Sequence, residues 1–171
     1  MLVTDLTTIA ENAEKKEAEN LQFRQLLQQK NVADIDRLVF QLNETITPQI
    51  DCTVCGNCCR SLMINVDEPD AERLSKHLAL DKEAFYEKYV ERSSQGLLAV
   101  MNKIPCHFLE DNKCTVYEAR PTECREFPGL QHAGFTKRLF AIFMHYGRCP
   151  IIYNVVEQLK EEVVPPTPKA E

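Results

Sequence analysis

The sequence predicts a mainly helical α+β fold: a small metal-stapled domain with a short β-hairpin and an N-terminal helical extension. The first fifty residues are rich in residue types that favour helices, and they contain no cysteine. All eight cysteines come after residue 51, and such clustered thiols suit metal binding. Strand-forming runs are short and flank one pair of turn residues, Asp111 and Asn112.

We expect three segments along the chain. Residues 1–50 form the helical extension, residues 51–162 form a cysteine-cluster metal-binding domain, and residues 163–171 form a flexible tail. The tail is rich in proline, a composition that opposes regular secondary structure.

The extension combines a polar helix-forming stretch with an apolar stripe. Glu, Lys, Gln and Ala dominate residues 11–30. The stripe then repeats at helical spacing through Ile35, Leu38, Val39, Leu42 and Ile46. Pro48 ends it, because a helix seldom passes the residue before a proline. We predict one long helix, or two joined near residues 30–31, whose stripe either packs on the domain's own core or meets a partner protein or a second copy.

Two further helices are predicted by their N-terminal caps. Asp67 begins one of them, with Pro69 in its first turn. Asp81 begins the next, in which Phe85 and Tyr89 lie on one face. We expect both helices to build the core.

Short elements are predicted around the later cysteines. Residues 107–110 and 113–118 flank the Asp111–Asn112 turn as a hairpin. Residues 118–127 favour one or two helical turns, closed by Pro128 and Gly129. The apolar run of residues 139–146 fits a strand or a buried helix equally well. Residues 149–163 then predict a helix with Pro150 near its start.

Composition limits the classes of function. The chain has 26 acidic and 20 basic residues and a net charge of −6, which argues against nucleic acid as a partner. The N-terminus has neither the basic leader nor the apolar run of a secretory signal. No segment reaches the roughly 18–20 apolar residues of a membrane span. We therefore expect a cytoplasmic protein that binds neither nucleic acid nor membrane, and whose reduced thiols bind metal or carry out redox chemistry.

The spacing of the cysteines favours metal. The first four follow the pattern C-x2-C-x2-C-C, and each C-x2-C step directs two sulfurs toward one ion, as in zinc sites and iron–sulfur proteins. The candidate metal ligands are the eight cysteines Cys52, Cys55, Cys58, Cys59, Cys106, Cys114, Cys124 and Cys149. Thiolate suits both zinc and iron, including iron in an iron–sulfur cluster, so the choice of metal stays open. Adjacent cysteines point apart, which favours more than one metal atom.

A basic residue stands directly beside four of these cysteines: Arg60, Lys113, Arg125 and Arg148. A neighbouring cation lowers the pKa of a thiol and offsets the negative charge of a thiolate site. His107, beside Cys106, is a weaker ligand candidate. No catalytic constellation stands out. The alternative is an iron–sulfur redox protein or a metal-dependent enzyme, with a carboxylate such as Glu110 as acid–base group.

The cysteine segments resemble the bacterial YkgJ-type CxxCxxCC cysteine-cluster family, which is described as a zinc- or iron-chelating domain. The shared segments are, in order, CTVCGNCCR, IPCHFLEDNKCTVYEARPTECREFP and a late Cys149-Pro150. The resemblance covers about Asp51–Pro150 and includes all eight cysteines, and it implies metal binding. The flagellin lysine N-methylase carries a similar cluster, but this chain has no Gly-rich loop for a methyl-donor cofactor.

Overall fold

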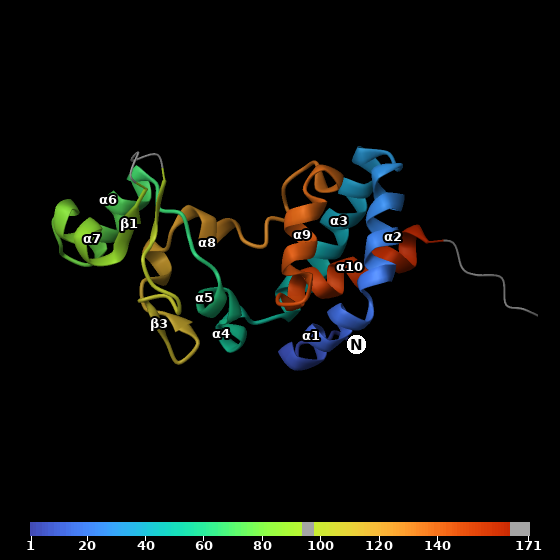
Figure 1. The fold of residues 1–171 in the computed structure, drawn as a ribbon, viewed down its shortest axis with the longest axis horizontal. Coiled ribbons are helices and arrows are strands. Elements are labelled where there is room, and N and C mark those ends of the chain that lie inside the picture. Colours follow the sequence, from blue (N-terminus) through green and yellow to red (C-terminus); the bar gives the residue numbers. More distant parts are fainter. Residues whose placement is uncertain (94–97, 165–171) are drawn as a thin grey trace, which may run out of the picture. The chain divides into compact units, whose positions relative to one another are not determined.

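The computed structural model describes residues 1–93 and 98–164 (Figure 1). It is 62% helical with two short antiparallel strand pairs, so the predicted mainly helical α+β class is confirmed. The α-helices are α1 (Leu6–Lys15), α2 (Glu17–Gln28), α3 (Val32–Ile46), α4 (Cys52–Cys55), α5 (Asn57–Ser61), α6 (Glu68–His77), α7 (Lys82–Tyr89), α8 (Thr122–Glu126), α9 (Leu139–Tyr146) and α10 (Pro150–Val163). The strands are β1 (Val90–Arg92), β2 (Ala99–Met101), β3 (Leu109–Glu110) and β4 (Lys113–Cys114), and short 3-10 turns are η1 (Thr47–Gln49), η2 (Tyr117–Ala119) and η3 (Phe135–Lys137).

The chain divides into two compact units. Met1–Ile50 and Pro128–Glu171 form the first, which we call the helical unit, and Asp51–Phe127 form the second, which we call the cysteine unit. The N-terminal helices thus share a unit with α9 and α10. Most of the predicted tail, from residue 165 on, lies outside the described residues.

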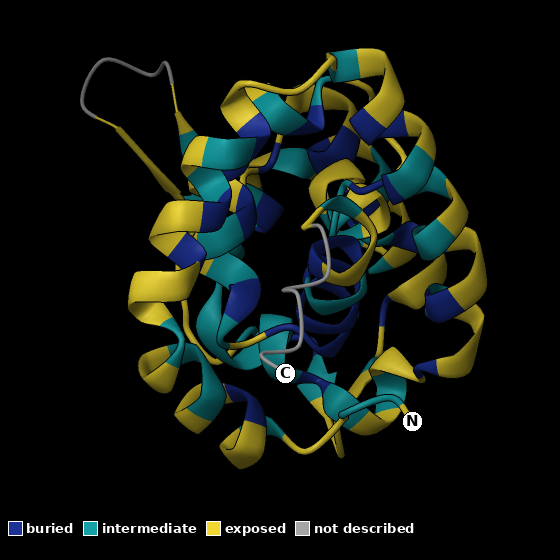
Figure 2. Ribbon diagram, turned by 90° about the vertical axis from the view of Figure 1, so that its right-hand side faces the viewer, coloured by how far each residue is buried: buried dark blue, intermediate teal, exposed yellow. Residues whose placement is uncertain are grey.

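The core of the helical unit forms where α3 packs against α10. Ile35, Val39 and Ile46 of the predicted apolar stripe are buried there. In α10 the buried side chains continue almost all round the helix, whereas most other helices bury one face and expose the other (Figure 2). The stripe therefore packs on the protein's own core.

The helix boundaries follow from local hydrogen bonds. Asn31 accepts the backbone N–H groups of Ala33 and Asp34 at 2.9 and 3.3 Å, so α3 begins near the predicted break at residues 30–31. A second break at Lys16 separates α1 from α2 and was not predicted. The ambiguous apolar run is helix α9, and Pro150 occupies the first turn of α10.

A buried carboxylate joins α3 to the turn before α9. Asp36 is 7% exposed, and it accepts the backbone N–H groups of Gly134 and Phe135 at 2.7 and 2.8 Å. Gly134 has φ +78°, a conformation that glycine adopts without strain. The hydrogen bonds fix η3, and η3 leads directly into α9.

The cysteine unit has its own core beside the two strand pairs. Its buried apolar residues are Val66, Ala71, Leu74, Phe85, Val90, Met101, Phe108, Val116 and Ala119. Asp67 and Asp81 cap α6 and α7 as predicted, accepting the N–H groups of Asp70 and Ala84 at 2.7 and 2.8 Å. Asp111 and Asn112 make the predicted hairpin turn with φ of 45° and 64°. The strand pair β1–β2 was not predicted.

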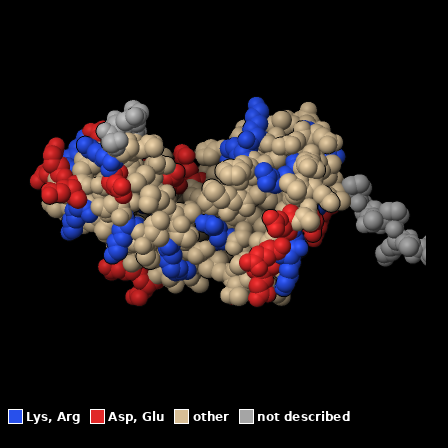
Figure 3. Space-filling model, viewed as in Figure 1, with Lys and Arg blue, Asp and Glu red and all other residues tan. Residues whose placement is uncertain are grey.

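Two further observations concern the charges on the surface and the length and apolar character of the helices. Acidic and basic side chains are interspersed on the face drawn in Figure 3. Among the described residues, no single helix has both the length and the apolar character needed to cross a membrane. In the part of the chain that the structure describes, α9 and α10 pass that test of length and composition only when taken together, and they are bent by 113° at the break between them.

Candidate metal centre

The four-cysteine loop folds as two short helices joined by a glycine. Asp51 begins α4 by accepting the N–H and hydroxyl groups of Thr53 at 2.8 and 2.7 Å. Gly56 ends α4 at φ +56°, and its N–H donates to the Cys52 carbonyl at 2.8 Å. A Cβ at this position would meet both Arg60 and Asn112 at 3.1 Å, so the tight turn requires glycine.

Arg60 holds this loop to the β3–β4 turn. Its guanidinium donates to the Cys55 carbonyl and to the side-chain oxygen of Asn112. Asn112 in turn donates to the Val54 carbonyl at 3.4 Å. The residue that the sequence marks only as a cationic neighbour of Cys59 is therefore also a tether between two cysteine-bearing segments.

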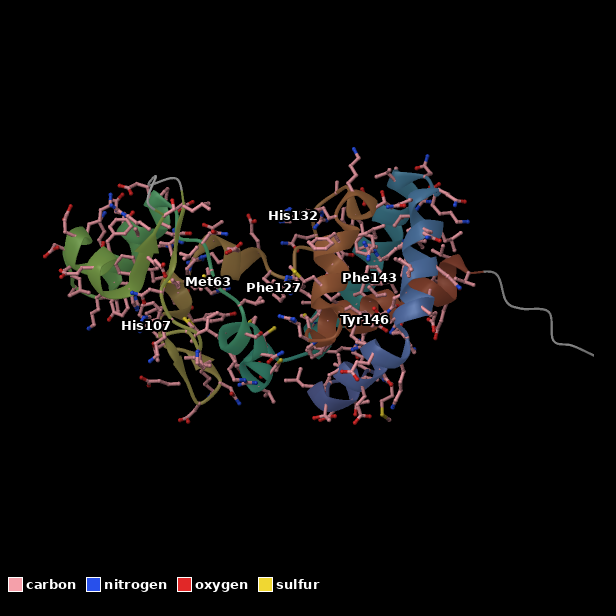
Figure 4. All side chains as sticks on the ribbon, viewed as in Figure 1. Met63, His107, Phe127, His132, Phe143 and Tyr146 are labelled. Carbon is pink, nitrogen blue, oxygen red and sulfur yellow. The ribbon has the colours of Figure 1, made fainter. Side chains whose placement is uncertain are left out.

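Six thiols line one cavity of about 240 Å³ in the cysteine unit. They come from the two loop helices, the segment before β3, strand β4 and helix α8: Cys52, Cys58, Cys59, Cys106, Cys114 and Cys124. The Cys106 N–H donates to the Cys59 carbonyl at 2.8 Å, which binds two of these segments together. The other walls are largely apolar and include Phe108, Val116 and Phe127. Figure 4 labels Phe127 among the side chains.

Asp70 positions the α8 segment that carries Cys124. Its carboxylate is 2% exposed and accepts the Thr122 hydroxyl at 2.9 Å and the Thr122 N–H at 3.0 and 3.1 Å. Arg73 donates to the same carboxylate and, at 3.3 and 3.0 Å, to the carbonyls of Ala119 and Arg120. The start of α8 is thus bonded to α6.

Most of the cavity thiols hold their protons more tightly than an ordinary cysteine. Burial raises the pKa of Cys52, Cys106 and Cys114, and it raises that of Cys124 to about 12. Cys58 is the exception: its sulfur lies 3.9 Å from that of Cys59, and the hydrogen bond they share lowers the pKa of Cys58 to about 6. The same bond raises the pKa of Cys59. A metal that binds these thiols must therefore displace protons.

Two arginines line the thiol cavity, Arg125 and Arg120. Arg125, expected from the sequence as a cationic neighbour of Cys124, also donates to the carbonyls of Glu118 and Arg120. Arg120 was not a candidate, yet its charge counteracts the burial that raises the pKa of Cys114. Its guanidinium lies 3.7 Å from the centroid of the Tyr117 ring. It lies six residues from Cys114, so a search for direct sequence neighbours misses it.

The remaining candidates are not among the residues that line the cavity. Cys55 is half-buried in the same loop but is not among the lining residues. Cys149 belongs to the helical unit, where it is 7% exposed and precedes α10. His107 hydrogen-bonds the Asn102 side chain at 2.6 Å, and its ring packs edge-on to Tyr89 (Figure 4).

The donor set fits a soft metal, although the thiols share the cavity without converging on one point. Among residues 1–93 and 98–164, no three His, Cys, Asp or Glu side chains already stand in ligand geometry. The observation that speaks for a metal is the chemistry of the lining: six sulfur donors and apolar side chains, which zinc and iron–sulfur centres both use.

Six thiols gathered from the four-cysteine loop and three later segments of the cysteine unit define a cysteine-cluster domain. The chain belongs to the CxxCxxCC family, described as a putative zinc- or iron-chelating domain, whose model matches residues 51–141. The resemblance predicted from the sequence is confirmed. The matched range contains seven of the eight cysteines and ends before Cys149. No solved structure matches the chain.

Proposed function

We propose that this protein binds zinc or iron through the thiolates of its cysteine unit and works in the reducing cytoplasm. The observation that carries the proposal is the single cavity lined by six thiols from separate segments. A fold that merely buried apolar cysteines would not need to gather them around one space beside a cation such as Arg120. Membership of a chelating family supports the same conclusion.

The proposed ligands are the seven cysteines inside the family match. Six line the cavity, and Cys55 stands three residues from Cys52 in the same helical turn. The eighth candidate, Cys149, rests on its place in the sequence alone and is not part of this proposed set. When bound, the metal would supply a strong electrostatic link between the segments that carry its ligands. Metal binding would therefore contribute directly to the stability of the cysteine unit.

A second candidate function is electron transfer by an iron–sulfur cluster, or catalysis at a metal with an open position. Six cavity thiols exceed the four that one tetrahedral ion needs. Phe108, Val116 and Phe127 give the cavity apolar walls, and limited solvent exposure is one of the features that set the potential of such clusters.

Elemental analysis and an absorption spectrum of protein purified without oxygen test both candidates. Stoichiometric zinc in a colourless protein is the result expected for structural, storage or recognition roles. Iron with acid-labile sulfide, and a visible band that bleaches on reduction, would select the redox candidate. Protein that holds neither metal, and takes up neither under anaerobic conditions, would refute the proposal.

A further inference from the structure

The helical unit carries an apolar face that its own core does not use. Phe140, Phe143 and Met144 follow one another at helical spacing along α9, and Gly147 comes directly after its last residue. Phe140 is 74% exposed and Met144 is 49% exposed, whereas the buried residues of α9 lie elsewhere on the helix. Large apolar side chains exposed together on one face mark surfaces that bind other molecules.

A groove continues this face toward α1 and α2. It has a volume of about 240 Å³, and Phe143 and Tyr146 of α9, with Gly147 just after the helix, line it opposite residues of the first two helices (Figure 4). Its other lining residues are Ala13, Glu17, Asn20, Leu21 and Arg24. Gly147 lets the helices approach closely, since a Cβ there would lie 2.9 Å from the Cβ of Ala13. Leu21 is 55% exposed at the edge of the groove.

The α2 side of the groove ends in two opposite charges. Glu17 and Arg24 lie two turns apart on the same face of α2, with Leu21 between them. Neither has an ion-pair partner among the described residues, and the Arg24 guanidinium lies 5.7 Å from the centroid of the Phe143 ring. The order along the helix is therefore acid, apolar, base.

The acid–apolar–base order along α2 is complementary to the same order on a second, antiparallel α2. If a second α2 lies antiparallel across the first, Glu17 of each copy faces Arg24 of the other. The two-fold axis then passes close to Leu21, so the exposed leucine of each copy meets the groove of the other. A heterologous partner would have no reason to require this symmetric placement of opposite charges about an apolar centre.

We propose that the α2–α9 groove is the interface of a two-fold symmetric homodimer, in which the α2 helices of two copies cross antiparallel. Glu17 pairs with Arg24 of the other copy at both ends, while Leu21, Phe140 and Met144 supply the apolar contact. The proposal rests on the helical unit alone and is independent of which metal the cysteine unit binds.

A charge exchange tests the proposal directly. Sedimentation equilibrium of the full-length, metal-loaded wild-type protein is expected to show dimers. The dimer dissociation constant should be about tenfold or more higher in Glu17→Lys and in Arg24→Glu, because each variant places two like charges opposite one another across the interface. The double variant Glu17→Lys/Arg24→Glu reverses both charges and is expected to recover wild-type dimerisation. Leu21→Asp is expected to abolish it.

The matched control is Glu72→Lys on α6. It makes the same charge change at an exposed helix position, where Glu72 pairs with Lys76 at 2.7 Å, and it should leave the dimer intact. Circular dichroism of each variant shows that the helices are retained. A wild-type monomer at every concentration, or a dimer indifferent to Glu17→Lys and Leu21→Asp, would overturn the proposal. A double variant as weak as the single ones would overturn the antiparallel arrangement.

Discussion

Replacing Asp70 by alanine should weaken the cysteine unit more than the loss of an ordinary surface ion pair. The carboxylate is 2% exposed, and it holds the start of α8, two residues before Cys124, through the N–H and hydroxyl of Thr122. A hydrogen bond to a charged group contributes about 1.5–3 kcal/mol to the free energy of unfolding. The hydroxyl can turn to water and the Arg73 side chain is 34% exposed, so we expect a net loss of about 3 kcal/mol.

The chain provides a matched control in Asp34. It also pairs with an arginine three residues later, Arg37, at 2.7 Å, but both side chains are more than half exposed. Asp34→Ala should therefore cost at most about 1 kcal/mol. Urea unfolding of the metal-loaded proteins measures both free energies, and metal content reports on the site. If Asp70→Ala and Asp34→Ala lower the free energy of unfolding equally, the argument that Asp70 anchors α8 is wrong.

Three further predictions concern the metal, the helical unit and the eighth cysteine. Chelation should lower amide hydrogen-exchange protection in the cysteine unit, whose segments carry the proposed ligands, and leave it unchanged in the helical unit, which contains none of the seven; equal protection with and without metal would contradict this. Burial alone would raise the pKa of Glu157, but hydrogen bonds from Lys16, Lys160 and Tyr146 outweigh it, so the pKa lies below the ordinary 4.5. The stabilisation it gives is present above pH 4.5 and is lost as the pH falls through the lowered value, so Glu157→Gln should flatten the acid limb of a plot of unfolding free energy against pH. Cys149→Ser should keep full metal content by elemental analysis, because Cys149 is buried at the start of α10 and lies outside the family match, whereas Cys106→Ser should lose metal.

Features set by a few neighbouring residues were predictable from the sequence. The caps Asp67 and Asp81 and the turn at Asp111–Asn112 all depend on hydrogen bonds or backbone angles within four residues. The caps and the turn form where the sequence predicts them, because no long-range contact competes with these local interactions.

The helical details that were missed lack such local signals. Lys16 interrupts the first helical stretch without a proline or glycine to mark the break. In α9 the buried Leu139 and Ile142 alternate with the exposed Phe140 and Met144, so apolar residues occupy both faces and hide the helical period. If Phe140 and Met144 lie in the proposed dimer interface, their apolar side chains contact the partner copy and not the protein's own core.

The sequence predicts the cysteines as candidate ligands, but it does not predict how they are grouped around the cavity. Spacing along the chain identifies the loop from Cys52 to Cys59, because those residues share two adjacent helical turns. That Cys106, Cys114 and Cys124 border the same cavity depends on tertiary contacts such as those of Arg60 and Asp70. For the same reason, adjacency to a cysteine singled out Arg125 but missed Arg120, although both arginines line the cavity.

X-ray absorption at the edge of the bound metal shows whether cysteine thiolates hold it, since it reports the atoms that surround the metal whatever the metal is. We expect these neighbouring atoms to be sulfur only, at about 2.3 Å for zinc. Cys106→Ser should lower the bound metal or replace a sulfur neighbour by oxygen. A first shell dominated by nitrogen or oxygen in the wild-type protein would contradict the claim that clustered cysteine thiolates hold the metal.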